Sequence, residues 1–155
     1  TFGPRQSTRA IIPSLLTQIS FGKAKINVGN LKPSRDFTYV KDTVEAFCKT
    51  LTAKNIKGEV INICNNFDIT VLDLLNVLKK ELKLDFSLKI QKKRFRPNKS
   101  EVFRLHGCNK KAKKLLNWKP YYTGATGFKK AIYETIEWYE NPKNLKKFNS
   151  DQFNL

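Results

Sequence analysis

The sequence predicts a mixed α/β fold, and two features of its hydrophobic pattern support this class. Apolar residues recur at helical spacing in several stretches, for example at Val44, Phe47 and Leu51. Between these stretches lie short runs that alternate apolar and polar residues, such as Ser87 to Gln91, and alternation of this kind is typical of a half-buried strand. Turn formers, as in residues 28–34, separate the two kinds of segment.

The chain is expected to alternate helices with short strands along its whole length. In chain order we expect a helix capped by Ser7 or Thr8 and running to about Ser20, a strand from Ala24 to Val28, a helix from about Asp42 to Lys54, a strand from Gly58 to Cys64, a helix from Thr70 to about Leu82, a strand from Ser87 to Gln91, a short helix capped by Asn109, and a last helix starting at Thr123 or Thr126.

The caps and buried faces of these elements follow from residue type. Thr70 and Asp73 match a capping box, and Asn117 tolerates the left-handed backbone at a helix end. Val60 and the neighbouring isoleucines should be buried in their strand. The helix faces expected in the core are formed by Ile11, Ile12, Leu15, Leu16 and Ile19; by Leu74, Leu75 and Leu78; by Ala112, Leu115 and Leu116; and by Phe128, Ile132, Ile136 and Tyr139.

Composition narrows the class of protein. Hydrophobic content of 40% and aromatic content of 12% suit a folded domain with a core. No apolar run approaches the ~20 residues that a membrane helix needs. The cysteines Cys48, Cys64 and Cys108 form no C-x-x-C pair and His106 is the single histidine, so neither a zinc site nor a disulfide framework is expected. Reduced thiols fit a cytoplasmic protein.

The net charge of +17 raises the possibility of nucleic-acid binding. The excess is mostly lysine, spread along the predicted helices and the C-terminal segment, whereas arginine is the residue that most often reads bases. The charge therefore favours a solvated lysine surface, with a basic nucleic-acid-binding module as the alternative.

One arginine stands out because of its position. Arg35 follows a run of turn formers and precedes a predicted helix, so it should emerge from a loop. A guanidinium matches phosphate geometry with paired hydrogen bonds, which makes Arg35 a candidate phosphate clamp. The alternative is that it pairs with a nearby carboxylate, Asp36 or Asp42.

The segment from Arg35 to Asp42, R-D-F-T-Y-V-K-D, resembles a motif of the extended short-chain dehydrogenase/reductases that act on nucleotide sugars. Further segments resemble motifs of the epimerase and 4,6-dehydratase branch of that family in the same order: Thr1 to Gln6, Ile11 to Pro13, Arg94 to Pro97 with Ser100 to Val102, Asn109 to Ala112, and Leu116 to Pro120. The resemblance implies the C-terminal half of an extended Rossmann-fold enzyme: a small mixed α/β substrate-binding domain plus elements that pack on a missing Rossmann core. It assigns residues 1–142 to this portion and leaves residues 143–155 as a polar tail.

The same resemblance implies a set of substrate-binding residues. Arg35 and Arg96 would bind the diphosphate, Pro97 would hold Arg96 extended, and Glu101 would lie nearby. Arg9, Ala10, Ile11 and Ile12 would contact the base, and Asn62 matches a family asparagine. Two departures weaken the match: Cys64-Asn65-Asn66 replaces family glycines, and Asn109 replaces an aspartate.

The resemblance also implies a function for the longer enzyme. It favours an NAD-dependent NDP-sugar 4,6-dehydratase, which oxidises the sugar at C4, eliminates water across C5 and C6, and returns the hydride at C6. A nucleotide-sugar epimerase is the near alternative, and family members are homodimers. This chain carries no glycine-rich dinucleotide fingerprint. We assign no catalytic Y-x-x-x-K pair in it, since Tyr133, for example, is followed by Glu137 rather than lysine. We therefore expect no catalytic residue in it, no activity of the fragment alone, and NAD or NADP bound mainly by the missing half.

Overall fold

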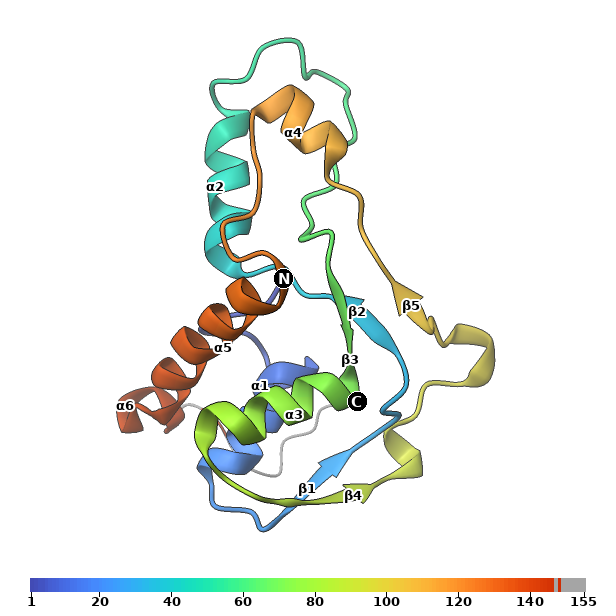
Figure 1. Ribbon diagram of the computed structural model, residues 1–155, viewed down its shortest axis with the longest axis vertical. Helices are drawn as coiled ribbons and strands as arrows, with labels where there is room; N and C mark the ends of the chain where they lie inside the picture. The colour runs from blue at the N-terminus through green and yellow to red at the C-terminus, as the bar shows by residue number, and fades with distance from the viewer. Residues whose placement is uncertain (147, 149–155) are drawn as a thin grey trace.

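The protein forms two lobes joined by a small sheet in the computed structural model, which describes residues 1–146 and 148 (Figure 1). The helices are α1 (Ile11–Ser20), α2 (Val40–Thr50), α3 (Val71–Leu82), α4 (Lys110–Leu116), α5 (Gly124–Glu140) and α6 (Pro142–Leu145). The strands are β1 (Lys25–Val28), β2 (Ser34–Asp36), β3 (Asp68–Thr70), β4 (Ser87–Ile90) and β5 (Arg104–Leu105), with 3-10 turns at Lys92–Arg94 and Asn98–Ser100.

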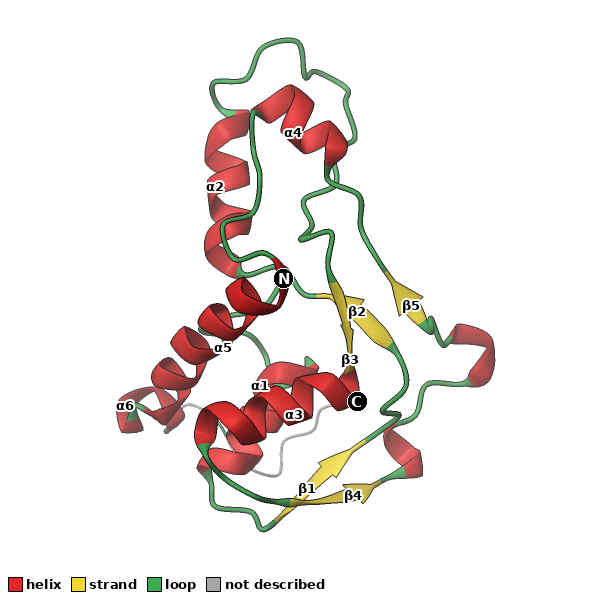
Figure 2. Ribbon diagram, in the orientation of Figure 1, coloured by secondary structure: helices red, strands yellow, loops and turns green. Residues whose placement is uncertain are grey.

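The strands form two separate small sheets (Figure 2). Strands β1 and β4 pair in parallel, with Lys25 opposite Ser87. Strand β2 lies at the centre of the other sheet, antiparallel to β3 and parallel to β5. Both sheets contain parallel pairs, which need long connections, and those connections include α2 and α3. The mixed α/β class is confirmed.

Most of the predicted helices and two of their predicted ends are confirmed. The Thr70 hydroxyl accepts from the Asp73 N–H at 3.0 Å, and Asp73 accepts in return from Thr70, which completes the capping box of α3. Asn117 takes the left-handed conformation after α4, with φ of 46°. The long helix α5 buries the four side chains expected of it. Helix α2 begins two residues before Asp42 and ends four residues before Lys54.

The N-cap positions of α4 and α5, Asn109 and Thr123, are as predicted, but neither side chain bonds to its own helix. The cap predicted at Ser7 or Thr8 is wrong. Helix α1 begins only at Ile11, after a turn in which the Ser7 carbonyl accepts from the Ala10 N–H at 3.0 Å. The Asn109 side chain donates to the Cys64 carbonyl at 3.0 Å. The Thr123 hydroxyl donates to the Asn65 carbonyl. The last two bonds hold the loop at residues 64–66 against neighbouring segments rather than satisfying the helix starts.

The predicted strand from Gly58 to Cys64 does not form, and Val60 is 81% exposed rather than buried. Ile61 and Ile63 do pack inward, against the small core of the α2–α4 lobe. A strand requires a hydrogen-bonded neighbour, and no described segment lies beside this one in a ladder. The alternating pattern of this segment therefore leads to burial of Ile61 and Ile63 on one side, but not to hydrogen bonding with a neighbouring strand.

The larger core lies in the other lobe, between α1, α3, α5 and the β1–β4 sheet. It is rich in aromatic rings, with Phe2 packed against Phe37, Tyr39 and Phe128 at centroid distances of 5.4–6.1 Å. Strand-like pairing of Phe2 with Tyr39 joins the N-terminal segment to this core. Burial raises the pKa of the Tyr139 hydroxyl to about 12. None of the helices among the described residues is long and apolar enough to cross a bilayer.

The end of the tail predicted for residues 143–155 lies outside the described residues. Within the described part, the chain continues into α6, which begins at Pro142 with Asn141 accepting from the Lys143 N–H at 3.0 Å.

Asp42 joins the two lobes. Its carboxylate is 2% exposed and accepts from the N–H groups of Tyr121 and Tyr122, at 2.9 and 3.0 Å. Its carbonyl accepts from the Trp118 indole at 3.1 Å. Burial raises the pKa of this carboxyl, although the two N–H donors oppose the shift. The segment between α4 and α5 is thus fixed by one acidic residue of α2.

We expect Asp42→Ala to lower the free energy of unfolding by about 2–3 kcal/mol, because two buried N–H groups lose their acceptor. Urea unfolding followed by circular dichroism measures the change. Asp85→Ala is the control, since Asp85 is an exposed partner of Lys79 and its loss should cost little. Equal effects of the two substitutions would contradict this role of Asp42.

Candidate functional site

A cavity of about 360 Å³ lies where the N-terminus of α1, the ends of β1 and β2, and the segment at residues 91–105 meet. Its volume is in the range of small-molecule sites, roughly 300–1,000 Å³. It is lined by Arg9, Ala10, Ile11, Ser14, Leu15, Asn27, Val28, Gly29, Asn30, Pro33, Arg35, Phe37, Val71, Arg94, Arg96 and Glu101. Apolar side chains and four arginines therefore share one space with a single carboxylate.

The segment at residues 91–105, hereafter the arm, forms one wall of this cavity and is anchored at both ends. At one end, the Gln91 N–H donates to the Val28 carbonyl and its side chain to Asn27, each at 2.8 Å. At the other, the Ser34 N–H donates to the Phe103 carbonyl at 2.8 Å, next to the β2–β5 pairing. The arm thus bridges the two sheets, as the loop between β4 and β5 shows in Figure 1.

Gly29 allows the arm to approach the end of β1 closely. A Cβ atom at this position would lie 2.7 Å from the Arg94 carbonyl oxygen, so any larger residue would push the arm away. The same contact fixes where the Arg94 side chain leaves the backbone. Gly29, which in the sequence has the pattern of an ordinary turn glycine, is therefore part of the cavity wall.

Arg35 fastens the arm to β2 through its side chain. One terminal nitrogen, Nη1, donates to the carbonyls of Ser34 and Val102 at 2.8 and 2.6 Å. The other, Nη2, lies 3.1 Å from Glu101 Oε1 in an ion pair whose side chains are 19% and 8% exposed. Arg35 therefore does pair with a carboxylate, but with Glu101 rather than Asp36 or Asp42. Three of its five N–H groups are occupied, and the side chain lines the cavity.

The other arginines of the cavity differ in how tightly they are held. The Arg94 Nε donates to Gln91 Oε1 at 2.8 Å, and burial lowers the pKa of its guanidinium. Arg96 and Arg9 are exposed, and among residues 1–146 and 148 their guanidinium groups have no hydrogen-bond or ion-pair partner. The site thus combines fixed cations with cations that are free to bind an anion.

The N-terminus of α1 also opens onto the cavity, at Ala10 and Ile11. The first N–H groups of a helix have no partner inside the helix, and its dipole places partial positive charge there. Together with the arginines, this makes the cavity a strongly positive site bordered by apolar side chains.

Asp36 fixes the backbone segments next to β2 through its carboxylate. Its carboxylate accepts from the N–H groups of Asn65 and Asn66, both at 2.8 Å, and of Gly107 at 3.3 Å. These bonds join β2 to the segments that follow residue 63 and β5. The acidic residue next to Arg35 therefore fixes the backbone rather than neutralising the arginine.

Asp68 ties the three strands of the central sheet together. From β3, it accepts from Arg104 Nε and Nη2 at 3.2 and 3.1 Å, and it lies 2.6 Å from His106 Nδ1. Hydrogen bonds from Arg104 first, and also from Ser34 and His106, hold the pKa of the Asp68 carboxyl well below its usual range. Since β5 is only two residues long, these side-chain bonds do much to keep it in the sheet.

The structure brings together six of the eight residues predicted to bind substrate. Arg35, Arg96, Glu101, Arg9, Ala10 and Ile11 all line the cavity. Ile12 does not, because it points into the main core and is 1% exposed. Asn62 lies on the unpaired segment of the other lobe and is exposed there, away from the cavity lining.

Four residues outside the predicted site also line the cavity: Arg94, Asn27, Asn30 and Phe37. Arg94 could have been found, because it stands two residues before Arg96 on the same arm. Asn27 lies within β1 and Asn30 follows it. Neither carries a local signal, since only the pairing of β1 with β4 brings them to the arm.

Residues 1–131 match the family model described as GDP-mannose 4,6 dehydratase. The chain belongs to this family. Human dTDP-D-glucose 4,6-dehydratase is 30% identical over 94% of this chain and 42% of its own length. GDP-mannose 4,6 dehydratase 1 of Arabidopsis thaliana is 33% identical over 88% of this chain and 35% of its own. The chain thus spans about 40% of the length of the curated dehydratases that it matches.

Solved structures of the same superfamily share its fold. UDP-glucuronic acid 4-epimerase from Bacillus cereus, in complex with UDP-glucuronic acid and NAD, superposes with a TM-score of 0.74 at 29% identity, over 88% of this chain and 42% of that chain. RMD from Pseudomonas aeruginosa, complexed with NADPH, gives a TM-score of 0.77 at 23% identity over 89% and 45% of the two chains. As a member of the dehydratase family, this chain has the fold of part of a nicotinamide-dependent Rossmann-type enzyme.

We expect Glu101→Gln to loosen the arm, because a charge-assisted bond to Arg35 becomes a weaker neutral one. Amide hydrogen exchange of residues 97–103 should accelerate about fivefold, in line with a loss of about 1 kcal/mol. Glu45→Gln, which removes an exposed pair with Lys49, is the control. Unchanged exchange in the arm would show that the ion pair does not fasten it.

We expect part of the stability of the chain to depend on ionised Asp68. Its folded pKa lies below the unfolded value of about 3.9, so the stabilisation is complete well above that pH and is lost as pH falls through it. Unfolding by urea at a series of pH values between about 6 and 3 should show a steeper loss for the wild type than for Asp68→Asn. Parallel curves for the two proteins would contradict the assignment.

Proposed function

We propose that this chain is the nucleotide-sugar-binding part of an NAD-dependent NDP-sugar 4,6-dehydratase. One observation carries the proposal: four arginines, a helix N-terminus and apolar side chains line one cavity of suitable volume. The diphosphate of such a substrate is a compact dianion, which guanidinium groups bind with paired, charge-assisted hydrogen bonds.

In this proposal the arginines have distinct roles. Arg35 is fixed before the ligand arrives, so little side-chain entropy is lost when its remaining N–H groups bind a phosphate. Arg96 has no partner among the described residues and adds a mobile second clamp. Arg94 lies deeper, beside Gln91. Glu101 keeps Arg35 in place and gives the cavity a hydrogen-bond acceptor for a hydroxyl group.

The base of the nucleotide would lie against the start of α1. Ala10 and Ile11 line the cavity there, with Leu15 and Phe37 supplying apolar surface. A planar base stacks on apolar and aromatic side chains at little polar cost, whereas the charged diphosphate must meet the arginines. The apolar and polar parts of the cavity therefore match the base and the diphosphate of a nucleotide sugar.

The cofactor and the catalytic groups belong to the remainder of the enzyme in this proposal. NAD, when bound, supplies hydride transfer at C4 and C6 of the sugar. This sequence offers no glycine-rich fingerprint for the pyrophosphate. Its one Y-x-x-x-K spacing, Tyr139 to Lys143, runs from the end of α5 into α6. The Tyr139 side chain is buried and its hydroxyl donates to the Gln6 carbonyl, so it is not placed to exchange a proton with a sugar hydroxyl. What its own residues do is bind and orient the nucleotide sugar, and we expect no turnover by this chain alone.

A nucleotide-sugar 4-epimerase is the second candidate. It is favoured by the likeness to the Bacillus cereus UDP-glucuronic acid 4-epimerase, which at 29% identity is comparable with that to the dehydratases. Both activities need the same diphosphate clamp, so the cavity described above serves either. The family match to a dehydratase over residues 1–131 supports the dehydratase as the first candidate.

We expect the purified chain to bind a nucleoside diphosphate sugar, tested by calorimetry with dTDP-glucose, GDP-mannose and UDP-glucose. Arg96→Ala should weaken binding about tenfold to 100-fold, the equivalent of one charge-assisted hydrogen bond of about 1.5–3 kcal/mol. Lys99→Ala is the matched control, because it removes a cation from the same arm outside the cavity.

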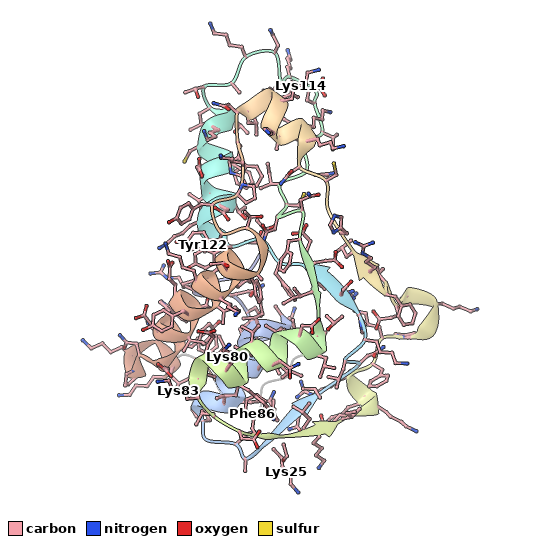
Figure 3. All side chains as sticks on the ribbon, in the orientation of Figure 1. Lys25, Lys80, Lys83, Phe86, Lys114 and Tyr122 are labelled. Atoms are coloured by element: carbon pink, nitrogen blue, oxygen red, sulfur yellow. The ribbon has the colours of Figure 1, made fainter. Side chains whose placement is uncertain are left out.

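Single-stranded and duplex DNA serve as competitors in the same assay. Lysines stand at opposite ends of the molecule, with Lys114 on α4 and Lys25 on β1 (Figure 3). No binding of any of the three sugars, together with tight and steeply salt-dependent DNA binding, would overturn the proposal in favour of a nucleic-acid-binding protein.

A further inference from the structure

Three polar side chains form a row of hydrogen bonds where the arm meets β1. Arg94 Nε donates to Gln91 Oε1, and Gln91 Nε2 donates to Asn27 Oδ1, both at 2.8 Å. All three side chains are partly buried, and Arg94 and Asn27 line the cavity. This row, Arg94–Gln91–Asn27, is hereafter the relay.

The relay permits only one arrangement of donors and acceptors. A guanidinium has N–H donors and no acceptor, so the Gln91 atom that faces Arg94 must be the carbonyl oxygen. The amide nitrogen of Gln91 then faces Asn27, and the Asn27 atom that accepts from it must be Oδ1. Asn27 Nδ2 is left over, and within residues 1–146 and 148 it makes no hydrogen bond. The charge on Arg94 therefore decides that Asn27 has a donor, not an acceptor, available for a ligand.

The backbone of Asn27 is held from α1, so its side chain starts from a fixed point. The Asn27 N–H donates to Gln18 Oε1 at 2.8 Å, and Gln18 Nε2 donates to the Asn27 carbonyl at 3.2 Å. Gln18 is 3% exposed and also donates to the carbonyl of Ser14, a cavity residue, at 3.0 Å. A donor fixed in this way before the ligand arrives discriminates well, because it cannot turn aside from a ligand that presents another donor.

The place of Asn27 in the cavity indicates which part of a nucleotide sugar it meets. The Arg35–Glu101 contact lies near one anchor of the arm, and the Gln91–Asn27 contact forms the other. With the diphosphate at Arg35, the base lies towards the second anchor, and its edge opposite the ribose points to Asn27. That edge distinguishes the bases, because uracil, thymine and guanine carry an exocyclic oxygen there and cytosine and adenine an amino group.

We propose that Asn27 selects the base of the nucleotide sugar by donating from Nδ2 to this exocyclic oxygen, with Gln91 and Arg94 as the positioning residues that fix its amide. The inference rests on the proposed function, since it needs a nucleotide sugar in this cavity. An amino group of cytosine or adenine would meet Nδ2 donor to donor and leave both groups without a partner. The chain should therefore prefer uracil, thymine or guanine nucleotides.

UDP-glucose and CDP-glucose are matched probes, because they differ only at this edge of the base. GDP-glucose and ADP-glucose give a similar contrast between oxygen and amino group for a purine. In calorimetry with the purified chain, we expect the oxygen-bearing member of the tighter-binding pair to bind about tenfold more tightly than the other. Asn27→Asp keeps an acceptor for Gln91 but replaces the free donor by a second acceptor, so it should reverse this preference.

Gln91→Glu tests the relay without changing Asn27. A glutamate offers acceptors to both neighbours, so Asn27 must turn its amide over and donate Nδ2 to it. Oδ1 then becomes available to the ligand, and the preference should move towards the amino-bearing base, as in Asn27→Asp. A purely structural role of Gln91 would instead weaken both members of a pair alike.

Asn30→Asp is the matched control, because Asn30 lines the same cavity and the substitution adds the same charge. The Asn30 Oδ1 accepts from the Lys32 N–H at 3.1 Å, a bond that aspartate retains. This variant should weaken both members of a pair by the same factor, and circular dichroism confirms that each variant folds.

Two kinds of result would contradict the inference, and they differ in what they say about the proposed function. Equal wild-type affinity within the tighter-binding pair, or a preference that Asn27→Asp and Gln91→Glu leave unchanged, would overturn the role of Asn27 alone. A preference that shifts with Asn30→Asp instead would do the same. Failure of the wild-type chain to bind any of the four nucleotide sugars would overturn the proposed function and this inference with it.

Discussion

The geometry of the cavity depends on the Arg35 guanidinium. It joins strand β2 to the arm through the Val102 carbonyl and the Glu101 carboxylate, and its bond to the Ser34 carbonyl holds the side chain against β2 itself. The arm carries Arg94 and Arg96, so this contact fixes the segment that brings both of them to the cavity. A phosphate-binding arginine that is also a structural tie is preorganised, which reduces what its ligand must order on binding.

The polar residues of the segment from Arg35 to Asp42 bind several distant parts of the chain. Asp36 holds the backbone of residues 65, 66 and 107, and Asp42 holds that of residues 121 and 122. Lys41 and the Tyr39 hydroxyl both donate to Glu134 on α5. Burial alone would raise the pKa of Glu134, but its hydrogen bonds from Lys41, Tyr122 and Tyr39 together lower it, so the carboxylate stays ionised in this network.

Periodicity and residue type predicted the helices, the β1 and β4 strands and the cavity residues that lie on recognisable motifs. They failed where the outcome depends on segments distant in sequence. The run from Gly58 to Cys64 has the pattern of a strand, but pairing requires a neighbour that the described chain does not provide. Asn109 and Thr123 have the residue types of caps, yet their side chains donate to the carbonyls of Cys64 and Asn65 instead of bonding to the helix starts. Arg94 and Asn27 meet only because β1 and β4 pair.

A structure of the chain crystallised with dTDP-glucose would test the central claim most directly. The account predicts that the diphosphate lies within hydrogen-bond distance of Arg35 and Arg96, with the base against Ala10 and Ile11 and with the Arg35–Glu101 contact retained. A nucleotide sugar bound elsewhere, or a cavity in which Arg35 must leave Glu101 and the Val102 carbonyl to reach the phosphate, would contradict it.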